Sequence, residues 1–489
     1  MKSSKSRQIQ GPTRRKIFIS LGLILLVLTA FFGGFFTQVA LRGESEAIVS
    51  DIVHIMDQVG FVYDREKDEY VKIDGDKIAT LIAGNFLDGY SEYYTEQEYK
   101  ALQKQKAGDY SGFGINILTE NAKSTKDGTN VIDSVTCNSP AFLADLKEGD
   151  KVISVNNGEE KAINNGKELI EFLNSTKIGD EVKFTVERNG SALDPITVKK
   201  SNYSRCYVTY QDSECYAYFA PKYGERADNV NEAYAMIRKN ENIGGNLEFD
   251  VDTDGDGNGN DIAMIKLYAF NGDAAEQFGA AIQYMVEERG RTRLLLDLCD
   301  NGGGSMTVLQ DVAAYLMKVD NGLVAKSTEK LDWSPEDKEE NKQYATTDYA
   351  IGKSKFNYKI TRISIIANRN TASASECLIT AVHNTQYAKL GDVYSKRNLV
   401  IVGSENNYDK DDIPDDEIQY RTYGKGIMQT TYELNAGGAL KITTAKLLDP
   451  WSNCIHKVGV IAHDNPRNQA QDYNQAVSKA VFILAEEIA

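Results

Sequence analysis

The chain has 489 residues, more than one typical domain, and predicts two or three domains with ordinary globular cores, since 42% of its residues are hydrophobic. Its formal net charge of -16 argues against nucleic acid as a partner, because phosphate binding requires a basic surface. The excess of acid commonly serves only solubility, so we assign it no partner of its own.

The N-terminal residues predict a membrane anchor. Residues 17–41 carry no charge and are mostly apolar, and the run is long enough to span a bilayer. By the positive-inside rule, the basic tail of residues 1–16 stays in the cytoplasm and the chain after Arg42 lies outside the membrane. We favour an uncleaved single-pass signal-anchor in the cell membrane over a cleaved signal peptide, because the run is long and lacks a good cleavage site.

Two regions of different pattern follow the anchor. Residues 45–107 have apolar positions at helical spacing and predict an N-terminal helical region. Residues 110–200 alternate short strand-like runs with turn residues and predict one small β-rich domain with two short helices. This domain resembles a PDZ domain through Gly112-Phe113-Gly114-Ile115 and through Ser139-Pro140-Ala141. The resemblance implies that Gly112, Phe113, Gly114 and Ile115 receive the carboxylate of a bound peptide.

An acidic segment further on has the spacing of a calcium loop. Residues 202–261 read as irregular, polar and tyrosine-rich. Within them, oxygen-bearing side chains fall at loop positions 1, 3, 5, 9 and 12, with glycine at position 6, as in calcium loops; they are Asp250, Asp252, Asp254, Asn258 and Asp261. A strand-like run follows where a calcium loop would continue into a helix. We therefore favour a solvated acidic turn and keep a structural calcium ion as the alternative.

The cysteines are scattered along the chain. No CxxC pair is present, which argues against a zinc site. An exported location permits disulfides, and Cys206 with Cys215 is the pair favoured by proximity. Cys299 and Cys377 are expected to be buried and unpaired.

After residue 262 strands and helices alternate, and two segments carry the chemistry. Ser373 follows the apolar strand-like run 363–367 and precedes a helix-like run. It therefore lies at a strand-to-helix turn, where the amides of a helix N-terminus stabilise negative charge. Lys425 stands between two glycines in the second segment, with Gln429 four residues later. Together the segments suggest a serine nucleophile activated by a lysine base.

Other residues compete for these roles. Thr371 and Ser375 are alternative nucleophiles, and Ser375 is also a candidate cap of the following helix. His383 lies on that helix, where a histidine-based mechanism would require it to point back to the serine. Lys446, in a predicted strand, is a second lysine candidate.

Several ordered blocks make the chain similar to the carboxyl-terminal processing peptidases, also called tail-specific proteases, over roughly residues 78–465. The blocks are Asp88-Gly89-Tyr90-Ser91 with Tyr93-Tyr94, the PDZ-like segment, Asp297-Leu298 with Asn301 and Gly303-Gly304, Ala372-Ser373-Ala374-Ser375-Glu376, Gly424-Lys425-Gly426 with Gln429, and Ile442-Thr443-Thr444-Ala445-Lys446 with Pro450. The resemblance implies a serine peptidase with a Ser–Lys dyad that needs no cofactor for catalysis.

The resemblance gives each residue a role. It makes Ser373 the nucleophile, Lys425 its base and Gln429 the residue that orients the lysine. Lysine can accept a proton only when it is neutral, and burial favours the neutral form. Gln429 can orient the amine without adding a negative charge that would keep it protonated.

The resemblance also implies an oxyanion hole, formed by backbone amides of Gly303 or Gly304 and of Ala374. This chain departs from the family at several positions. The family's Asp-Leu-Arg is here Asp297-Leu298-Cys299, its Asn-Pro-Gly-Gly has Gly302 in place of proline, and an aspartate on the helix after the nucleophile matches Asn384. The segment between Ser373 and Lys425 is longer than usual, which predicts an insertion between residues 392 and 422.

We expect a multidomain α+β protein. Its parts are the tail at 1–16, the transmembrane helix at 17–41, the helical region at 45–107, the PDZ-like domain at 110–200 and an α/β peptidase core of the ClpP/crotonase-like type at 201–489, with insertions at about 211–261 and 393–421. The predicted function is an extracytoplasmic serine endopeptidase that cleaves proteins with apolar C-termini near those ends. An oligomer is compatible with the sequence. The alternatives are a catalytically degenerate PDZ-bearing scaffold and an enzyme using the same fold for other acyl chemistry.

Overall fold

In a computed structural model of the chain, the described residues are 62–64, 69–71, 75–106, 109–117, 129–213, 215–221, 234–236, 261–330, 343–405 and 418–486. They belong to two compact units, residues 1–82 and 83–489. In the first unit, β1 (Val62–Asp64) and β2 (Glu69–Val71) form an antiparallel hairpin before α3 (Gly75–Phe86) begins. The predicted membrane segment 17–41 lies outside the described residues. Within the described part, no helix is long and apolar enough to cross a membrane.

The region predicted to be wholly helical, 45–107, also contains strands. Besides α3 and α4 (Glu96–Lys106), it includes β1, β2 and β3 (Glu92–Tyr94). Strand β3 pairs antiparallel with the start of β25 (Ala439–Leu448), far along the chain. The prediction was wrong for β3 because its two tyrosines favour an extended backbone once a partner strand is available, and no local pattern reveals that partner.

The PDZ region folds as a separate β-rich cluster with its own hydrophobic core. Its elements are β4 (Asp109–Gly112), β5 (Ile115–Ile117), β6 (Ile132–Val135), α5 (Pro140–Leu143), β7 (Lys151–Asn156), β8 (Glu160–Ala162), α6 (Gly166–Ser175), β9 (Glu181–Arg188), β10 (Ser191–Ala192), β11 (Ile196–Lys199) and β12 (Ser201–Ser204). Alternate residues of β9 point into this core, where Val182, Phe184 and Val186 are fully buried. Ser139 begins α5 by accepting a hydrogen bond from the Phe142 amide, and Pro140 follows at the first helical position.

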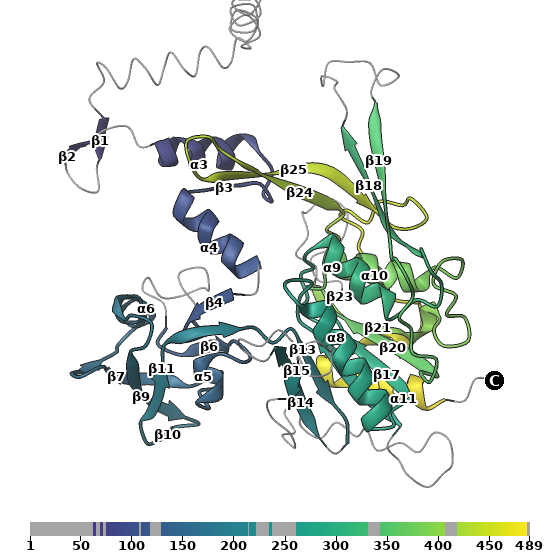
Figure 1. Cartoon of the computed structure of the whole chain (residues 1–489), viewed down its shortest axis with the longest axis horizontal. Helices are drawn as coiled ribbons and strands as arrows, with labels where there is room; N and C mark the ends of the chain where they lie inside the picture. The colour runs from purple at the N-terminus through teal and green to yellow at the C-terminus, as the bar shows by residue number, and fades with distance from the viewer. Residues whose placement is uncertain are drawn as a thin grey trace, which may run out of the picture. The chain divides into compact units, whose positions relative to one another are not determined.

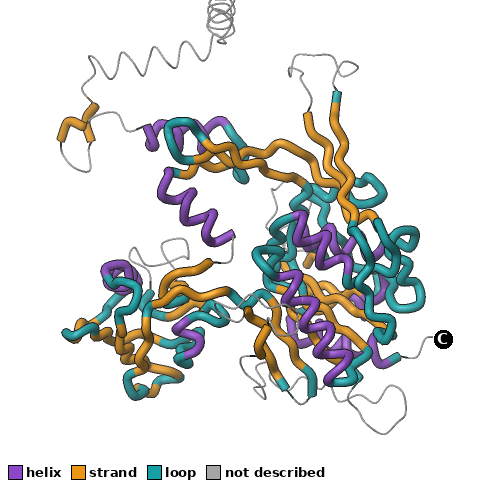
Figure 2. Tube along the Cα trace, in the orientation of Figure 1, coloured by secondary structure: helices purple, strands orange, loops and turns teal. Residues whose placement is uncertain are grey.

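The peptidase core is built on an eight-stranded sheet. Its strand order is β15-β14-β13-β16-β17-β20-β21-β26, and the five strands from β16 to β26 are parallel. The strands are β13 (Val208–Gln211), β14 (Tyr216–Pro221), β15 (Tyr234–Met236), β16 (Ile262–Leu267), β17 (Arg293–Asp297), β20 (Arg362–Ala367), β21 (Leu399–Val402) and β26 (Gln469–Ala470). Figure 1 shows this sheet with helices on either side of it, and Figure 2 shows the same arrangement by element type.

Two hydrophobic clusters cover the two faces of the sheet. The larger cluster joins one face to α8 (Ala274–Gln283), α9 (Met306–Ala314) and α10 (Ala374–His383). The smaller joins the other face to α11 (Tyr473–Ala485). Parallel strands that are buried on both faces read as continuous apolar runs, which is the pattern of β17 and β20.

The stretch predicted to be irregular, 202–261, supplies part of this sheet. β13 pairs antiparallel with both β14 and β16 and is buried along its whole length. Tyr210 and Tyr218 are among the largest fully buried side chains of the described part. The prediction of an irregular stretch was wrong here because tyrosine rings favour strands and pack well in a sheet.

The favoured disulfide also fails on this hairpin. Cys206 precedes β13 and Cys215 precedes β14, so antiparallel pairing sets them at opposite ends of the hairpin, roughly 20 Å apart at about 3.3 Å per strand residue. A disulfide requires the two Cα atoms to lie within about 7 Å. All six cysteines are free, and Cys299 and Cys377 are buried as predicted.

A second sheet stands beside the first. It has the strand order β19-β18-β25-β24, with β3 pairing to the start of β25. Its strands are β18 (Leu323–Lys330), β19 (Tyr344–Ala350), β24 (Ile427–Glu433) and β25. Lys425 lies two residues before β24, so this sheet brings the lysine segment to the peptidase core.

Candidate active site

The predicted nucleophile lies at a strained turn between β20 and α10. Ser373 has φ 57° and ψ -117°, an unusual backbone conformation for a residue other than glycine. It is half-buried, whereas Ala372, Ala374 and Ser375 on either side are buried. The turn places Ser373 at the beginning of α10, where the helix N-terminus stabilises anions.

The two alternative nucleophiles have structural partners. The Thr371 hydroxyl donates to the carbonyl of Leu298 at 2.8 Å, and the Ser375 hydroxyl donates to the carbonyl of Asn301 at 2.8 Å. Both side chains are fully buried. They therefore fasten the nucleophile turn to the loop that follows β17, which leaves Ser373 as the accessible hydroxyl of the three.

His383 is also excluded from a role beside the serine. It is the last residue of α10, roughly 14 Å along the helix axis from its first turn. Its ring bonds to the Tyr394 hydroxyl at 2.8 Å, and burial lowers its pKa to about 3, which keeps it neutral. Asn384 caps the same helix end by accepting the amides of Gln386 and Tyr387.

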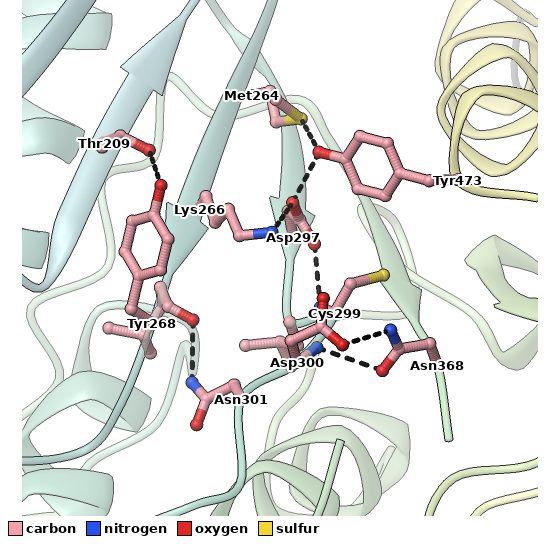
Figure 3. A network of polar contacts seen from close by, with 12 residues as sticks. Thr209, Met264, Lys266, Tyr268, Asp297, Cys299, Asp300, Asn301, Asn368 and Tyr473 are labelled. Atoms are coloured by element: carbon pink, nitrogen blue, oxygen red, sulfur yellow. Dashed lines mark hydrogen bonds and ion pairs between the residues drawn. The ribbon is translucent and has the colours of Figure 1, made fainter. Parts of the chain in front are cut away.

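The loop after β17 is held by a polar network that sequence reasoning missed (Figure 3). Asp297, fully buried, accepts the Cys299 amide at 2.8 Å and the Tyr473 hydroxyl at 2.8 Å, and pairs with Lys266 at 3.1 Å. Lys266 lies on the neighbouring strand β16. It supplies the positive charge that pairs with Asp297 in this chain.

Further bonds tie this loop to the nucleophile turn. Asp300, with φ 64°, donates its amide to Asn368 at 3.0 Å and accepts the Asn368 side-chain amide at 2.8 Å. Asn301 donates to the carbonyl of Leu267 and accepts the Ala372 amide on its own carbonyl. The loop is therefore fastened to two neighbouring strands and to the turn that carries Ser373.

The three glycines of this loop differ in what a side chain would meet. A Cβ on Gly303, with φ 98°, would lie 2.9 Å from both the Ala374 amide nitrogen and the Ser373 Cβ. A Cβ on Gly304 would lie 2.4 Å from the Phe270 carbonyl oxygen. A Cβ on Gly302 would meet nothing within 4 Å. The predicted oxyanion residues Gly303 and Ala374 are thus direct neighbours.

The amides of the predicted oxyanion residues are not equivalent. The Gly303 amide donates to the side chain of Asn301 at 3.0 Å. Among the described residues, the amides of Gly304 and Ala374 have no hydrogen-bond acceptor. An incoming oxyanion would find these two donors available.

Replacing Gly303 with alanine is expected to lower kcat for a peptide substrate about 10²-fold, because the methyl group would occupy the space beside the Ala374 amide and remove a donor from the transition state. The matched change Gly302→Ala adds the same methyl group in open space and should leave kcat within about twofold. Steady-state kinetics of both variants, with melting temperatures, test this. Equal effects from the two changes would contradict the assignment.

The buried carboxylate of Glu376 links the serine segment to the lysine segment. One of its oxygens accepts the amides of Ser373 at 2.7 Å and Lys425 at 2.9 Å. The other accepts the Thr422 hydroxyl at 2.6 Å and the Gly424 amide at 2.7 Å. Burial raises the pKa of Glu376 although all four donors favour its charged form. Segments far apart in the sequence are therefore held together by one side chain.

The glycines beside Lys425 are required by close packing. A Cβ on Gly426 would lie 2.2 Å from the His456 amide nitrogen, and Gly424, with φ 86°, packs against the amides of Val458 and Gly459. The Tyr423 amide also donates to the Thr371 carbonyl at 2.9 Å. The lysine segment thus lies between the nucleophile turn and the loop after β25.

Lys425 is the lysine of the core whose environment favours a neutral amine. Burial lowers its pKa, and the nearby charge of Lys441 lowers it further, against the opposing effects of Asp88 and Glu376. Lys266 behaves differently, because its ion pair with Asp297 outweighs burial and raises its pKa. Lys446, the other candidate, is exposed on β25.

Among the described residues, the side chains of Ser373, Lys425 and Gln429 are not hydrogen-bonded to one another. In the described part of the chain, no hydrogen bond joins the Ser373 hydroxyl to the Lys425 amine, although their backbones share Glu376. Gln429, on β24, directs its side-chain amide to the Thr443 hydroxyl at 3.0 Å, and not to Lys425. Catalytic hydrogen bonds often tighten only when substrate binds.

The predicted peptide-binding residues line a groove of about 540 Å³ in the PDZ region. Gly112 ends β4, Phe113 is buried in the PDZ core, and a Cβ on Gly114 would lie 2.1 Å from the Ser139 Cβ. Ile115 begins β5, which in the described part pairs only with β6. The groove is further lined by Ile117, Ile170, Leu173, Lys200 and Arg205. An extended peptide could add to the open edge of β5.

Most of the predicted calcium loop lies outside the described residues, which begin again at Asp261. There the carbonyl of Asp261 accepts the amides of Thr292 and Arg293, as expected before a strand. Among the described residues, no group of three or more His, Cys, Asp or Glu side chains is arranged to hold a metal ion.

Comparison with known families identifies the chain. Residues 261–392 and 418–464 match peptidase family S41, and residues 114–198 match the PDZ domain. The chain therefore carries a peptidase family S41 domain together with a PDZ domain. It is a serine-type peptidase with a PDZ domain, which confirms the resemblance to carboxyl-terminal processing peptidases. The gap in the S41 match, residues 393–417, coincides with the insertion predicted from the spacing of Ser373 and Lys425.

This peptidase is similar to curated bacterial serine proteases. A probable CtpA-like serine protease of Staphylococcus saprophyticus is 26% identical over 99% of this chain and 80% of its own length. The carboxy-terminal processing protease CtpA of Bacillus subtilis is 23% identical over 91% of this chain and 75% of its own. Among solved structures, the photosystem II D1 C-terminal processing protease aligns with 91% of this chain and 92% of its own, at 18% identity and a TM-score of 0.43.

Proposed function

We propose that this peptidase is an endopeptidase that cleaves protein substrates near their C-termini through a dyad of Ser373 and Lys425. The observation that carries the proposal is the carboxylate of Glu376, which accepts the backbone amides of both residues. A serine on a strained turn, a lysine with a lowered pKa and two available amides at Gly304 and Ala374 support the same chemistry.

In this mechanism the Ser373 hydroxyl oxygen attacks the carbonyl carbon of the scissile bond while the Lys425 amine accepts the hydroxyl proton. The negative oxygen that forms is received by the amides of Gly304 and Ala374. The protonated lysine then gives its proton to the departing amine, which leaves an acyl-enzyme on Ser373. Water, deprotonated by the same lysine, releases the second product.

The PDZ groove is proposed to select the substrate by its C-terminus. Its apolar residues suit an apolar end residue, and the Gly112–Ile115 turn offers backbone amides for the terminal carboxylate. Lys200 and Arg205 add positive charge to the groove lining. We further propose that residues 17–41 anchor the enzyme in the cell membrane with its catalytic part outside the cytoplasm, as the charge pattern of the first 42 residues indicates.

An unfolded protein ending in an apolar residue is expected to be cleaved at least tenfold more efficiently than the same protein with an amidated C-terminus, because amidation removes the charge that the groove would bind. The measurement is kcat/KM for the two substrates, with the full chain solubilised in detergent. Cleavage of neither substrate would favour the alternative function, a scaffold that binds exposed C-termini. Equal cleavage of both would contradict selection by the groove.

A further inference from the structure

The amine of Lys425 needs more than a fixed backbone. A lysine side chain has several rotatable bonds, and Glu376 holds only the main chain of this segment. A base must also be kept dry, because water stabilises the ammonium form. The residue that meets the amine is Tyr90, whose ring centroid lies 5.3 Å from the Lys425 nitrogen.

Tyr90 is held by hydrogen bonds of its hydroxyl and its amide, and the next residue, Ser91, is bonded to β25. Its hydroxyl bonds to the hydroxyl of Tyr423 at 3.3 Å, two residues before the lysine. Its amide donates to the Asp88 carboxylate at 3.1 Å, which also accepts the Ser91 hydroxyl at 2.7 Å. The Ser91 hydroxyl in turn accepts the Thr443 amide of β25 at 3.2 Å. The turn 88–91 is thus docked on the sheet that carries the lysine segment.

We propose that Tyr90 is a positioning residue for Lys425, and that its ring covers the amine, excludes water from it and fixes its place beside the nucleophile turn. The inference rests on the proposed function and adds to it a residue some 330 positions away in the sequence. Thr443 connects the two sides of this arrangement, because its hydroxyl also accepts the side-chain amide of Gln429. Gln429 would therefore influence the position of Lys425 indirectly, through Thr443 and the turn 88–91.

The charged groups around the amine come from four elements. Glu376 on α10 and Asp88 in the turn before β3 favour the ammonium form, and Lys441 on β25 opposes it. His456, after β25, faces the edge of the Tyr90 ring, and burial lowers its own pKa. These groups oppose one another, so the water-excluding surroundings have the deciding effect on the pKa of Lys425, and burial is its largest cause.

The tyrosine ring acts on the amine in two opposite ways. Its electron-rich face attracts the ammonium form, which raises the lysine pKa by about 1.5 units at most. Its bulk excludes water, and desolvation of a lysine can lower the pKa by up to about 3–5 units. Because exclusion of water is the larger effect, removing the ring should raise the pKa of Lys425.

The test is the pH dependence of kcat/KM for Tyr90→Ala in the full chain. The neutral amine is the active form, so activity rises as the pH rises through the lysine pKa. We expect the acidic limb of the profile to move up by about one unit and kcat/KM at neutral pH to fall about tenfold, with recovery at high pH. A purely structural role would lower activity at every pH. Tyr90→Phe keeps the ring and should leave the limb within about 0.3 unit.

The matched control is Tyr99→Ala. Tyr99 lies on α4, a few residues after the docked turn, and its hydroxyl donates to Glu433 at 3.2 Å. Removing the Tyr99 side chain weakens the contact between this segment and the second sheet but leaves the Lys425 amine covered. The acidic limb of the pH profile should therefore not move. If Tyr90→Ala does not fold, as judged by its melting temperature, Tyr90→Gln wets the amine with less loss of volume and is expected to show the same shift.

A second measurement does not depend on cleavage. Trace labelling with acetic anhydride at a series of pH values, read by mass spectrometry, gives the pKa of the Lys425 amine in the Ser373→Ala background. A pKa unchanged by Tyr90→Ala, or higher activity of that variant at neutral pH, overturns the inference while the dyad stands. Activity of the wild type that survives in Ser373→Ala overturns the proposed function, and the labelling result still decides the role of Tyr90.

Discussion

Replacing Ser373 with alanine is expected to lower kcat/KM for a protein substrate by about 10⁴-fold or more, to the level left by binding and the oxyanion donors alone. Lys425→Ala should have a comparable effect, because the serine hydroxyl is a poor nucleophile without a base. The double variant should be no worse than either single one, since the two residues act as a unit. Cleavage kinetics with an unfolded protein substrate provide the measurement.

The control for this series is Ser375→Ala. Its buried hydroxyl holds the carbonyl of Asn301, so the change should cost about tenfold at most through looser positioning. If Ser373→Ala kept full activity and Ser375→Ala lost it, Ser375 would be the nucleophile and Ser373 would not. Melting temperatures within a few degrees of the wild type ensure that lost activity reports on chemistry.

Glu376→Gln should cause the next largest loss, about 10³-fold in kcat/KM with a lowered melting temperature. Each carboxylate oxygen accepts two donors, so an amide would turn its own NH₂ group toward two of them. Hydrogen bonds to a charged group contribute about 1.5–3 kcal/mol each, which predicts a loss of stability of about 3–6 kcal/mol. Small displacements of a nucleophile and its base are themselves costly for the rate.

Thr422→Val separates the two consequences. It removes one donor to Glu376 and leaves the carboxylate charged, so its losses should be clearly smaller than those of Glu376→Gln. Glu287→Gln is a surface control, because that exposed residue bonds to side chains at the surface, those of Lys359 and Asn357. If Glu376→Gln retained wild-type activity and stability, the carboxylate would have no part in joining the two segments.

Local pattern was enough to single out the two segments that carry the proposed dyad. Ser373 could be found because an apolar strand, a small-residue turn and a helix follow one another, and Lys425 because glycines flank it. The PDZ region was predictable for the same reason, since the glycine turn at 112–114 and the start of α5 at Ser139 are both local. These features depend on residues that are neighbours in the sequence.

What could not be predicted depends on contacts between distant segments. Glu376 read as an ordinary acidic residue in the first turn of a helix, and only the fold brings Gly424 and Lys425 to it. Tyr90 belongs to a motif with no evident chemistry until it is seen over the lysine amine. Lys266 pairs with Asp297 from a neighbouring strand, which no pattern in its own segment suggests. Their roles arise from packing, which a single sequence does not display.

The pairing of β3 with β25 has a consequence for how the enzyme is made. The residues of the proposed site come from segments spread between residues 88 and 443. The sheet that unites these segments needs strands from both ends of that span, β3 and β25. Contacts of such long range form late in folding. A chain emerging from its N-terminus acquires the proposed nucleophile before the proposed base. By the proposed mechanism it cannot cut proteins, itself included, until its C-terminal strands have joined the rest.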